Sequence, residues 1–299
     1  MEHSNNPKPE SHFCNIDGHR IHYLDEGHGE TILLVHGIPE WSMLYAGLVK
    51  QLSRTHRCIV PDHLGFGLSD LDNKADLTPA AHASRLVNFI EQLKLSDIHL
   101  VVHDYGGPIG IGALVAQPKL FKSLTITNTW LWNLAGTNAA KGLALMNGWF
   151  GKWLYLSYGF SVKFMAKNAF AQKSCYRKNR ETFMQAHHTE AQRFANYKLM
   201  LEMLGSSSYF DESLKRLHQT PIKAQIIWGV KDKFFPAKEY LARWKMSFPT
   251  LKSVNWRIVA IFRIWNYQQT IVIRLNSLSG ICKPDNSTLL ACFLSTFKS

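Results

Sequence analysis

Along the first half of the chain, short apolar runs alternate with longer segments in which apolar residues recur every third or fourth position. Short runs are typical of buried β-strands, and the longer period is that of an amphipathic helix. Strands that alternate with helices form a mostly parallel sheet covered on both faces, so the predicted fold class is α/β. The pattern predicts strands at residues 11–16, 20–24, 31–35, 57–60, 98–103, 123–129 and 222–229, and helices at 41–52, 79–93, 108–116 and 238–248.

Two short sequences refine this pattern. Asp17-Gly18 separates the first two strand-like runs and is typical of a two-residue hairpin, which predicts that the sheet starts with an antiparallel pair. Thr78 precedes the helical segment 79–93 and is expected to cap its N-terminus.

After residue 130 the pattern becomes helical and rich in aromatic residues, and the strand pattern returns only near residue 222. We interpret residues 131–217 as a helical cap, inserted into a core made of residues 1–130 and 218–250. Residues 251–299 differ in composition and form a divergent C-terminal segment. The aromatic residues of the cap region include Trp132, Trp149, Trp153, Tyr155, Tyr158 and Tyr176.

Composition narrows the classes of function. The 299 residues are 46% hydrophobic and 19% charged, which fits a globular protein with a substantial core. There is no run long enough to span a membrane and no secretory signal pattern, so a cytoplasmic protein without membrane contact is expected. The net charge of +12 comes from dispersed basic residues, which argues against nucleic-acid binding, and the five scattered cysteines show neither disulfide nor metal spacing. No metal or other cofactor is expected.

The strand-like run 98–103 ends at Asp104, and two glycines, Gly106 and Gly107, follow almost at once. A strand that turns sharply into a helix needs small residues near the bend, because the turn pushes its central side chain into solvent. In the common version of this turn the central residue is Ser, which needs a base before it can attack. An aspartate is already ionised at neutral pH, so it can attack carbon directly and form an ester. Asp104 is therefore the candidate nucleophile, although a surface Asp after a strand would show the same local sequence.

Three further segments extend the likeness to a known family. His-Gly-Ile-Pro-Glu-Trp at 36–41 follows a strand, Pro-Asp-His-Leu-Gly-Phe-Gly-Leu-Ser-Asp spans 61–70, and Trp-Gly-Val-Lys-Asp ends at Asp232. Together with Asp104 they resemble the α/β-hydrolase superfamily, in the branch with an Asp nucleophile that includes haloalkane dehalogenases and epoxide hydrolases. The resemblance covers residues 12–250.

The resemblance implies both a fold and a set of roles. The fold would be an α/β-hydrolase core, a mostly parallel sheet flanked by helices, with an inserted helical cap. The backbone amides of Ile38 and Tyr105 would form the oxyanion hole. Asp232 would be the acid that orients a catalytic histidine, although in isolation it reads as a turn carboxylate.

The expected histidine is missing. This superfamily orders its catalytic residues as nucleophile, acid, histidine, yet the last histidine of the chain, His218, precedes Asp232. None occurs in residues 251–299. Three other histidines near the predicted site or in the cap are expected to be structural or solvated: His103, His187 and His188.

We hypothesise that the C-terminal segment follows a shifted reading frame. If Arg257 is encoded by AGR, regrouping the codons of residues 256–261 from each third base gives Glu, Asn or Asp, a variable residue, and then permits Gly, His and Phe. That order is similar to the family segment that carries the histidine. The code permits this reading without requiring it, because a third base of Ala260 other than C would forbid the His codon.

The resemblance also implies a mechanism in two steps. Asp104 attacks carbon and a leaving group departs, and a water activated by histidine then hydrolyses the ester. Without that histidine the chain is predicted to react once and stall. A small apolar substrate is expected, and the oligomeric state is left open.

The resemblance leaves two substrate classes open, haloalkanes and epoxides. Dehalogenases usually carry Trp after the nucleophile and a polar residue in place of Ile38, whereas Tyr105 and Ile38 stand here, so the halide would depend on other indole groups. We favour a haloalkane dehalogenase, with substrate-binding candidates Trp130, Trp132 and Trp153.

Two alternatives are kept. An epoxide hydrolase would polarise its substrate with cap tyrosines, of which the chain offers Tyr155, Tyr158, Tyr176 and Tyr197. The chain would otherwise be a catalytically inactive scaffold that binds a small apolar ligand, which the absent histidine favours.

Overall fold

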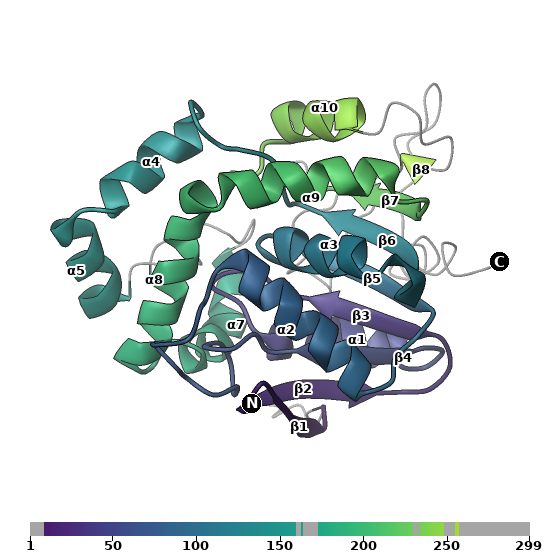
Figure 1. The fold of residues 1–299 in the computed structure, drawn as a ribbon. Helices are drawn as coiled ribbons and strands as arrows, with labels where there is room; N and C mark the ends of the chain where they lie inside the picture. The colour runs from purple at the N-terminus through teal and green to yellow at the C-terminus, as the bar shows by residue number, and fades with distance from the viewer. Residues whose placement is uncertain are drawn as a thin grey trace.

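The computed structural model describes residues 9–159, 163, 173–229, 232, 234–247 and 255–256. A twisted β-sheet lies between helices, and a group of helices extends from one end of it (Figure 1). The strands are β1 (Ser11–Ile16), β2 (His19–Glu26), β3 (Thr31–Val35), β4 (Arg57–Pro61), β5 (Ile98–His103), β6 (Phe121–Thr127), β7 (Lys223–Ile227) and β8 (Asn255–Trp256). The core helices are α1 (Ala46–Leu52), α2 (Pro79–Gln92), α3 (Gly106–Ala116), α9 (Ser207–Gln219) and α10 (Ala237–Ser247), with 3₁₀ turns η1 (Ser42–Tyr45) and η2 (Pro118–Leu120).

The eight described strands have the order β1-β2-β4-β3-β5-β6-β7-β8. β1 pairs with β2, and β2 with β4, in antiparallel fashion, and the remaining pairs are parallel. This arrangement confirms the predicted α/β-hydrolase architecture with its antiparallel start. The Asp17-Gly18 turn has φ values of +53° and +81°, the left-handed backbone that a two-residue hairpin requires.

The two faces of the sheet follow the alternation of side chains along a strand. In β3, Leu33 and Val35 join the core cluster under α2 and α3, whereas Ile32 and Leu34 join the cluster under α1. The sheet is therefore buried on both faces, as a mostly parallel sheet must be. Thr78 caps α2 as predicted, since its hydroxyl accepts a hydrogen bond from Ala81 N–H at 3.3 Å.

The helices beyond β6 are α4 (Asn138–Met146), α5 (Trp149–Tyr158), α7 (Lys173–Gln185) and α8 (Glu190–Gly205). In Figure 1 α4, α5 and α8 extend beyond the carboxyl ends of the strands. Two buried side chains, those of Trp41 and His187, connect this region to the core. The Trp41 indole donates to the Thr182 carbonyl at 2.9 Å, and His187 Nε2 contacts the Pro39 carbonyl at 3.2 Å.

The predicted boundary of the cap at residue 217 stays a prediction. Helix α9 crosses that boundary, and it packs against α3 of the core. The Tyr209 hydroxyl, from α9, donates to the Pro108 carbonyl at 3.0 Å. A cap that ends at α8 would describe the packing of these helices equally well.

Two predicted boundaries differ from the structure near residue 104. Helix α3 begins at Gly106 instead of residue 108, because a proline fits the first turn of a helix and does not mark its start. Strand β6 ends at Thr127 instead of residue 129, because Asn128 turns away at a φ of +30°. Both differences lie where the chain leaves the sheet to form the candidate site.

Candidate active site

The predicted nucleophile, Asp104, lies between β5 and α3 at a φ of +49°. This backbone conformation is strained for a residue with a side chain, and such strain is concentrated at functional sites. The turn is held by a hydrogen bond from Gly107 N–H to the Asp104 carbonyl at 3.0 Å and by another from the Thr129 hydroxyl at 2.5 Å. A side chain at Gly106 would collide with the Val35 carbonyl, and one at Gly107 with the Thr129 hydroxyl. The two glycines therefore allow the sharp strand-to-helix turn.

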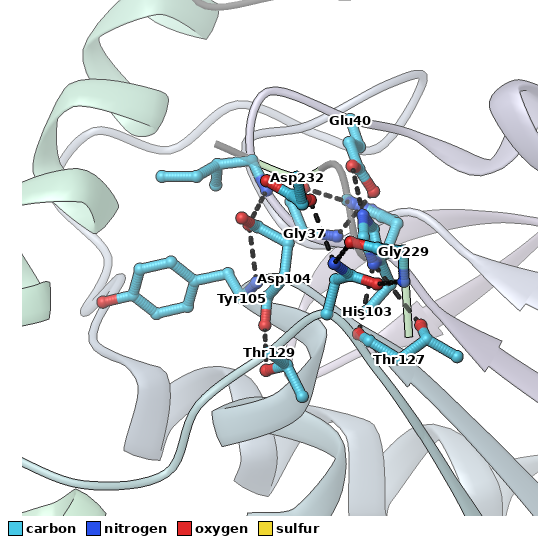
Figure 2. A network of polar contacts seen from close by, with 12 residues as sticks. Gly37, Glu40, His103, Asp104, Tyr105, Thr127, Thr129, Gly229 and Asp232 are labelled. Carbon is cyan, nitrogen blue, oxygen red and sulfur yellow. Dashed lines mark hydrogen bonds and ion pairs between the residues drawn. The ribbon is translucent and has the colours of Figure 1, made fainter. Parts of the chain in front are cut away.

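One carboxylate oxygen of Asp104 accepts two backbone hydrogen bonds (Figure 2). Ile38 N–H donates to Oδ1 at 2.9 Å, and Tyr105 N–H donates to the same oxygen at 2.6 Å. These are the two amides that the sequence predicts for the oxyanion hole. A Cβ at Gly37 would collide with Asp104 Oδ1, so the loop must carry glycine there to approach so closely. The structure thus brings Asp104, Ile38 and Tyr105 together.

The two loops that resemble family motifs are braced by buried polar contacts. His36 Nδ1 donates to the Gly37 carbonyl at 2.9 Å, and its Nε2 accepts from His63 N–H at 3.1 Å, which fixes a neutral ring. Burial lowers the pKa of His36, consistent with that form. Asp62 Oδ1 accepts from Ser42 N–H at 2.6 Å, and its Oδ2 contacts His22 Nδ1 at 2.7 Å. The glycine-rich loop is therefore a structural support behind the site.

Asp232 is held beside the site by a hydrogen bond from Asn128, whose role the sequence does not predict. Asn128 Nδ2 donates to Asp232 Oδ2 at 3.1 Å, and its Oδ1 accepts from Gly229 N–H at 2.7 Å. The other oxygen of Asp232 accepts from Phe234 N–H at 2.8 Å. Asp232 therefore stabilises its own turn, as a turn carboxylate would, and it also lies close to the strand-to-helix turn at Asp104 (Figure 2). The hydrophobic pattern places Asn128 inside the predicted strand 123–129, so it offers no signal for this role.

A buried ion pair adjoins the elbow on its other side. His103 Nε2 lies 3.4 Å from Glu40 Oε1, and both side chains are almost fully buried. Glu40 Oε2 also accepts from Gly37 N–H at 3.1 Å, and His103 Nδ1 lies 3.2 Å from the Thr127 carbonyl. The pair thus ties the loop that carries Ile38 to the end of strand β5. His103 is buried in this ion pair and not solvated, and Glu40 was not recognised from the sequence as its partner.

The charges of these groups act on one another. Burial alone would lower the pKa of His103, but the Glu40 carboxylate, with Asp104 and Asp232 farther away, raises that pKa to about 9. His103 is therefore a cation at neutral pH. Burial and the negative charge of Glu40 raise the pKa of Asp104 to about 7, against the opposing effects of His103 and the two backbone N–H groups.

The aromatic candidates for substrate binding lie in three different environments. Trp130 is buried, with its ring 5.1 Å from that of Tyr105 and stacked at 5.7 Å on Phe235. Trp132 packs against Trp244 of α10, at 5.3 Å between ring centres. Trp153 lies on α5 and is 46% exposed. Trp130 packs its ring against that of Tyr105, the residue after Asp104, and the substrate role of all three stays a prediction.

The Tyr105 ring points away from the Asp104 carboxylate (Figure 2). Its hydroxyl is buried, and burial raises its pKa well above the usual value. Within the described part of the chain, this hydroxyl has no hydrogen-bond partner. Tyr105 therefore contributes its backbone amide to the site, while its side chain belongs to the core.

The other histidines considered as substitutes, and any groups that could hold a metal ion, can be located within the described residues. His187 is buried against the Pro39 carbonyl, whereas His188 and His218 are exposed. In the described ranges no group of three or more His, Cys, Asp or Glu side chains is arranged to hold a metal ion. None of the helices described there is long and apolar enough to cross a membrane. The predicted frame-shifted segment lies largely outside the described residues.

Comparison with known proteins agrees with this geometry. Residues 30–256 match the model of the alpha/beta hydrolase fold family. The chain is 33% identical over 260 residues to a cis-3-alkyl-4-alkyloxetan-2-one decarboxylase of Shewanella oneidensis, which covers 80% of this chain and 78% of that protein. It is 37% identical to haloalkane dehalogenase 2 of Mycobacterium tuberculosis over 123 residues, a match that covers 41% of this chain and 43% of the relative.

The solved structures show the same fold. The haloalkane dehalogenase DatA from Agrobacterium tumefaciens C58 superposes with a TM-score of 0.73 at 14% identity, covering 85% of this chain and 89% of that one. The parallel sheet, the sharp turn after β5 and the match to the family model all agree. The chain belongs to the α/β-hydrolase fold family.

Proposed function

We propose that Asp104 is the nucleophile of a haloalkane dehalogenase-type hydrolase that forms an ester with carbon. The observation that carries this proposal is the pair of amides, Ile38 N–H and Tyr105 N–H, on Asp104 Oδ1. They hold one oxygen in place, so the other, Oδ2, attacks the carbon that bears the halogen. The halide leaves with the electron pair of its bond, and Oδ1 becomes the carbonyl oxygen of the ester.

The same amides also suit the hydrolysis of that ester. When water adds to the carboxyl carbon, negative charge develops on Oδ1, which already faces two N–H donors. The water needs a base, and Asp232 would orient it. The chain has no histidine after His218, and His103 is protonated at neutral pH. The first step therefore proceeds and the second stalls.

Single-turnover chemistry tests this proposal. Purified protein mixed with excess 1-bromobutane is expected to release bromide in a burst that stops near one equivalent. Intact-mass and peptide analysis should then find one butyl group on the peptide that contains Asp104. Asp104→Asn should abolish both the burst and the adduct, because an amide is a poor nucleophile at carbon.

A matched variant controls for folding. Glu91→Gln changes an exposed carboxylate on α2, outside the segments that form the site, and it should keep the burst. Alkylation at another residue, or an unchanged burst in Asp104→Asn, would exclude Asp104 as nucleophile. Steady release of many equivalents would show instead that another base completes the cycle.

A second candidate function is the decarboxylation of an oxetan-2-one. The relative with this name matches over 78% of its length, much more than the dehalogenase does. In such a reaction Asp104 would displace the ring oxygen from C4, which breaks the C4–O bond and frees a carboxylate. Loss of CO2 from C3 then forms the C3=C4 double bond as Asp104 leaves. This cycle restores the nucleophile and needs neither water nor a histidine.

The two candidates differ in turnover. A cis-3,4-dialkyl oxetan-2-one should give CO2 and alkene continuously if the second is correct, and no catalytic release if only ester formation is possible. The epoxide hydrolase alternative has less support from two of its four tyrosines, because Tyr155 already donates to Asn196 Oδ1 and Tyr197 to the Met146 carbonyl. The side chains of the other two, Tyr158 and Tyr176, lie outside the described residues. Diol formation from an epoxide would be the result that favours it.

A further inference from the structure

An unusual apolar surface lies where α4 meets α5, far from Asp104 along the chain. Leu145 is 80% exposed, Trp149 is 83% exposed and Phe150 is 56% exposed. We call residues 145–153 the cap corner. In Figure 1 the junction of α4 and α5 lies at the outer left edge of the molecule, away from the sheet. Large aromatic side chains are rarely left in water at such exposure without a partner surface.

The aromatic rings of the cap corner form a continuous strip. The Trp149 and Phe150 rings lie 5.9 Å apart edge to face, and the Phe150 and Trp153 rings are stacked at 5.9 Å. The opposite side of α5 packs inward, where Tyr155 is 1% exposed and donates to Asn196 of α8. The strip is therefore additional to the side chains that hold α5 in the cap.

The charged residues of α4 and α5 have one sign. The two helices carry Lys141 and Lys152 and no Asp or Glu. Within the cap region, Lys141 of α4 and Lys152 of α5 are exposed. Lys152 lies within the cap corner, with its ammonium 5.7 Å from the centre of the Phe194 ring. The surface therefore combines exposed aromatic and aliphatic groups with cations.

We propose that the cap corner docks on anionic phospholipid membranes. Trp and Phe side chains favour the boundary between headgroups and acyl chains, and an aliphatic Leu145 beside them adds apolar area for that boundary. Lysines next to such a strip bind the negatively charged headgroups. The contact is peripheral and requires no membrane-spanning helix. It departs from the sequence-based expectation of no membrane contact, which considered only spanning segments and signal patterns. It does not depend on the chemistry proposed for Asp104.

A second copy of the chain is a poorer occupant. In a two-fold contact the same surface meets itself, which would place the lysines of α4 and α5 against lysines, with no acidic residue on either helix to compensate. Single-stranded nucleic acid also combines with aromatic and basic surfaces, but it stacks on aromatic rings and gains nothing comparable from an exposed leucine. The exposure of Leu145 therefore favours lipid.

Vesicle co-sedimentation of the full chain tests the proposal. The protein should bind vesicles of equal parts phosphatidylcholine and phosphatidylglycerol, and bind phosphatidylcholine alone roughly tenfold more weakly. Leu145→Ser with Trp149→Ser should reduce binding to the mixed vesicles by about tenfold or more, because the inserted apolar area is lost. Lys141→Glu with Lys152→Glu should reduce it by a similar factor and weaken its salt dependence.

Phe13→Ser is the matched control. Phe13 is an exposed aromatic residue of β1, 44% exposed and covered by the Arg20 guanidinium at 4.7 Å, and it lies outside the cap. This variant should bind mixed vesicles like the unmodified protein. Equal loss in Phe13→Ser, equal binding to both kinds of vesicle, or no binding at all would overturn the proposal.

Separate measurements test whether a second copy of the chain or a single-stranded nucleic acid binds the cap corner instead. A dimer in sedimentation velocity that Leu145→Ser with Trp149→Ser converts to monomer would replace the membrane with a second copy. Binding of an oligo(dT) strand that the same double variant abolishes, without vesicle binding, would replace it with nucleic acid. Thermal unfolding of every variant checks that the fold is retained.

Discussion

At the level of single residues, the environment of Asp104 determines when this carboxylate can react. The strained backbone aims the side chain at the two amides, while burial and Glu40 raise its pKa to about 7. An aspartate with that pKa is only partly ionised at neutral pH, and only the ionised form attacks carbon. His103 opposes Glu40, because its positive charge stabilises the Asp104 carboxylate. The pair around the loop therefore adjusts the ionised fraction of Asp104, the proposed nucleophile.

This balance predicts opposite effects of two substitutions. The rate of the bromide burst should rise with pH through a midpoint near 7, since the Asp104 pKa is about 7. Glu40→Gln removes a negative charge and should move the midpoint to lower pH. His103→Gln removes a positive charge and should move it to higher pH. The pH profile of the single-turnover rate measures both shifts.

Glu91→Gln serves as the control for this profile, because Glu91 is exposed on α2. Its midpoint should match that of the unmodified protein. Shifts of the same sign in Glu40→Gln and His103→Gln would mean that the two residues act through packing of the loop and not through charge.

The sequence suggests roles for some residues of the candidate site and not for others. Asp104 and Tyr105 belong to one local motif, and Ile38 to another, so their roles can be inferred from short segments. Glu40 and His103 are ion-paired across 63 positions of the chain, and a single sequence carries no signal for that pairing. Asn128 falls inside the predicted strand 123–129, so the pattern does not mark it, and its contact with Asp232 depends on the order of strands β6 and β7 in the sheet.

At the level of elements, the turn from β5 to α3 depends on the absence of side chains at its glycines. Gly106 lies against the backbone of β3, where the Val35 carbonyl occupies the position of any Cβ. Because the obstacle is backbone, a rotamer change cannot relieve it. The strand, the turn and the helix would have to move apart.

Gly106→Ala is therefore expected to destabilise the protein by about 3 kcal/mol or more, or to prevent folding. Gly142→Ala is its matched control, since no atom lies within 4 Å of a Cβ at Gly142 in α4. That variant should be neutral or stabilising by about 0.5–1 kcal/mol, because alanine loses less backbone entropy in a helix. Urea unfolding measures both. Equal effects of the two substitutions would contradict the close packing of the elbow.

The hydrophobic pattern predicts the core elements well because their burial is regular. Strand β3 and helix α2 begin where the pattern places them, since apolar period and capping signals agree there. The segment 41–52 is expected as one helix but forms η1 followed by α1. Ser42 N–H donates to Asp62 Oδ1, a contact between distant segments that local periodicity cannot reveal.

At the level of the whole molecule, the described sheet reaches β8, which pairs in parallel with β7 at Asn255 and Trp256. The match to the family model ends at residue 256 as well. The codon regrouping that restores a family-like segment begins at the same position. The change of composition, the end of the family match and the regrouped codons therefore coincide along the chain.

The frame hypothesis predicts the behaviour of a repaired chain. If the third base of the Ala260 codon is C, a gene read in the alternative frame from Trp256 would encode a histidine four residues later along the regrouped segment. That histidine would follow Asp232 in the family order, so it could activate water and hydrolyse the Asp104 ester. The repaired protein should release many equivalents of bromide from 1-bromobutane where the present chain releases one. Changing the restored histidine to Gln should return the protein to a single burst, whereas a repaired chain that still stalls after one equivalent would contradict the hypothesis.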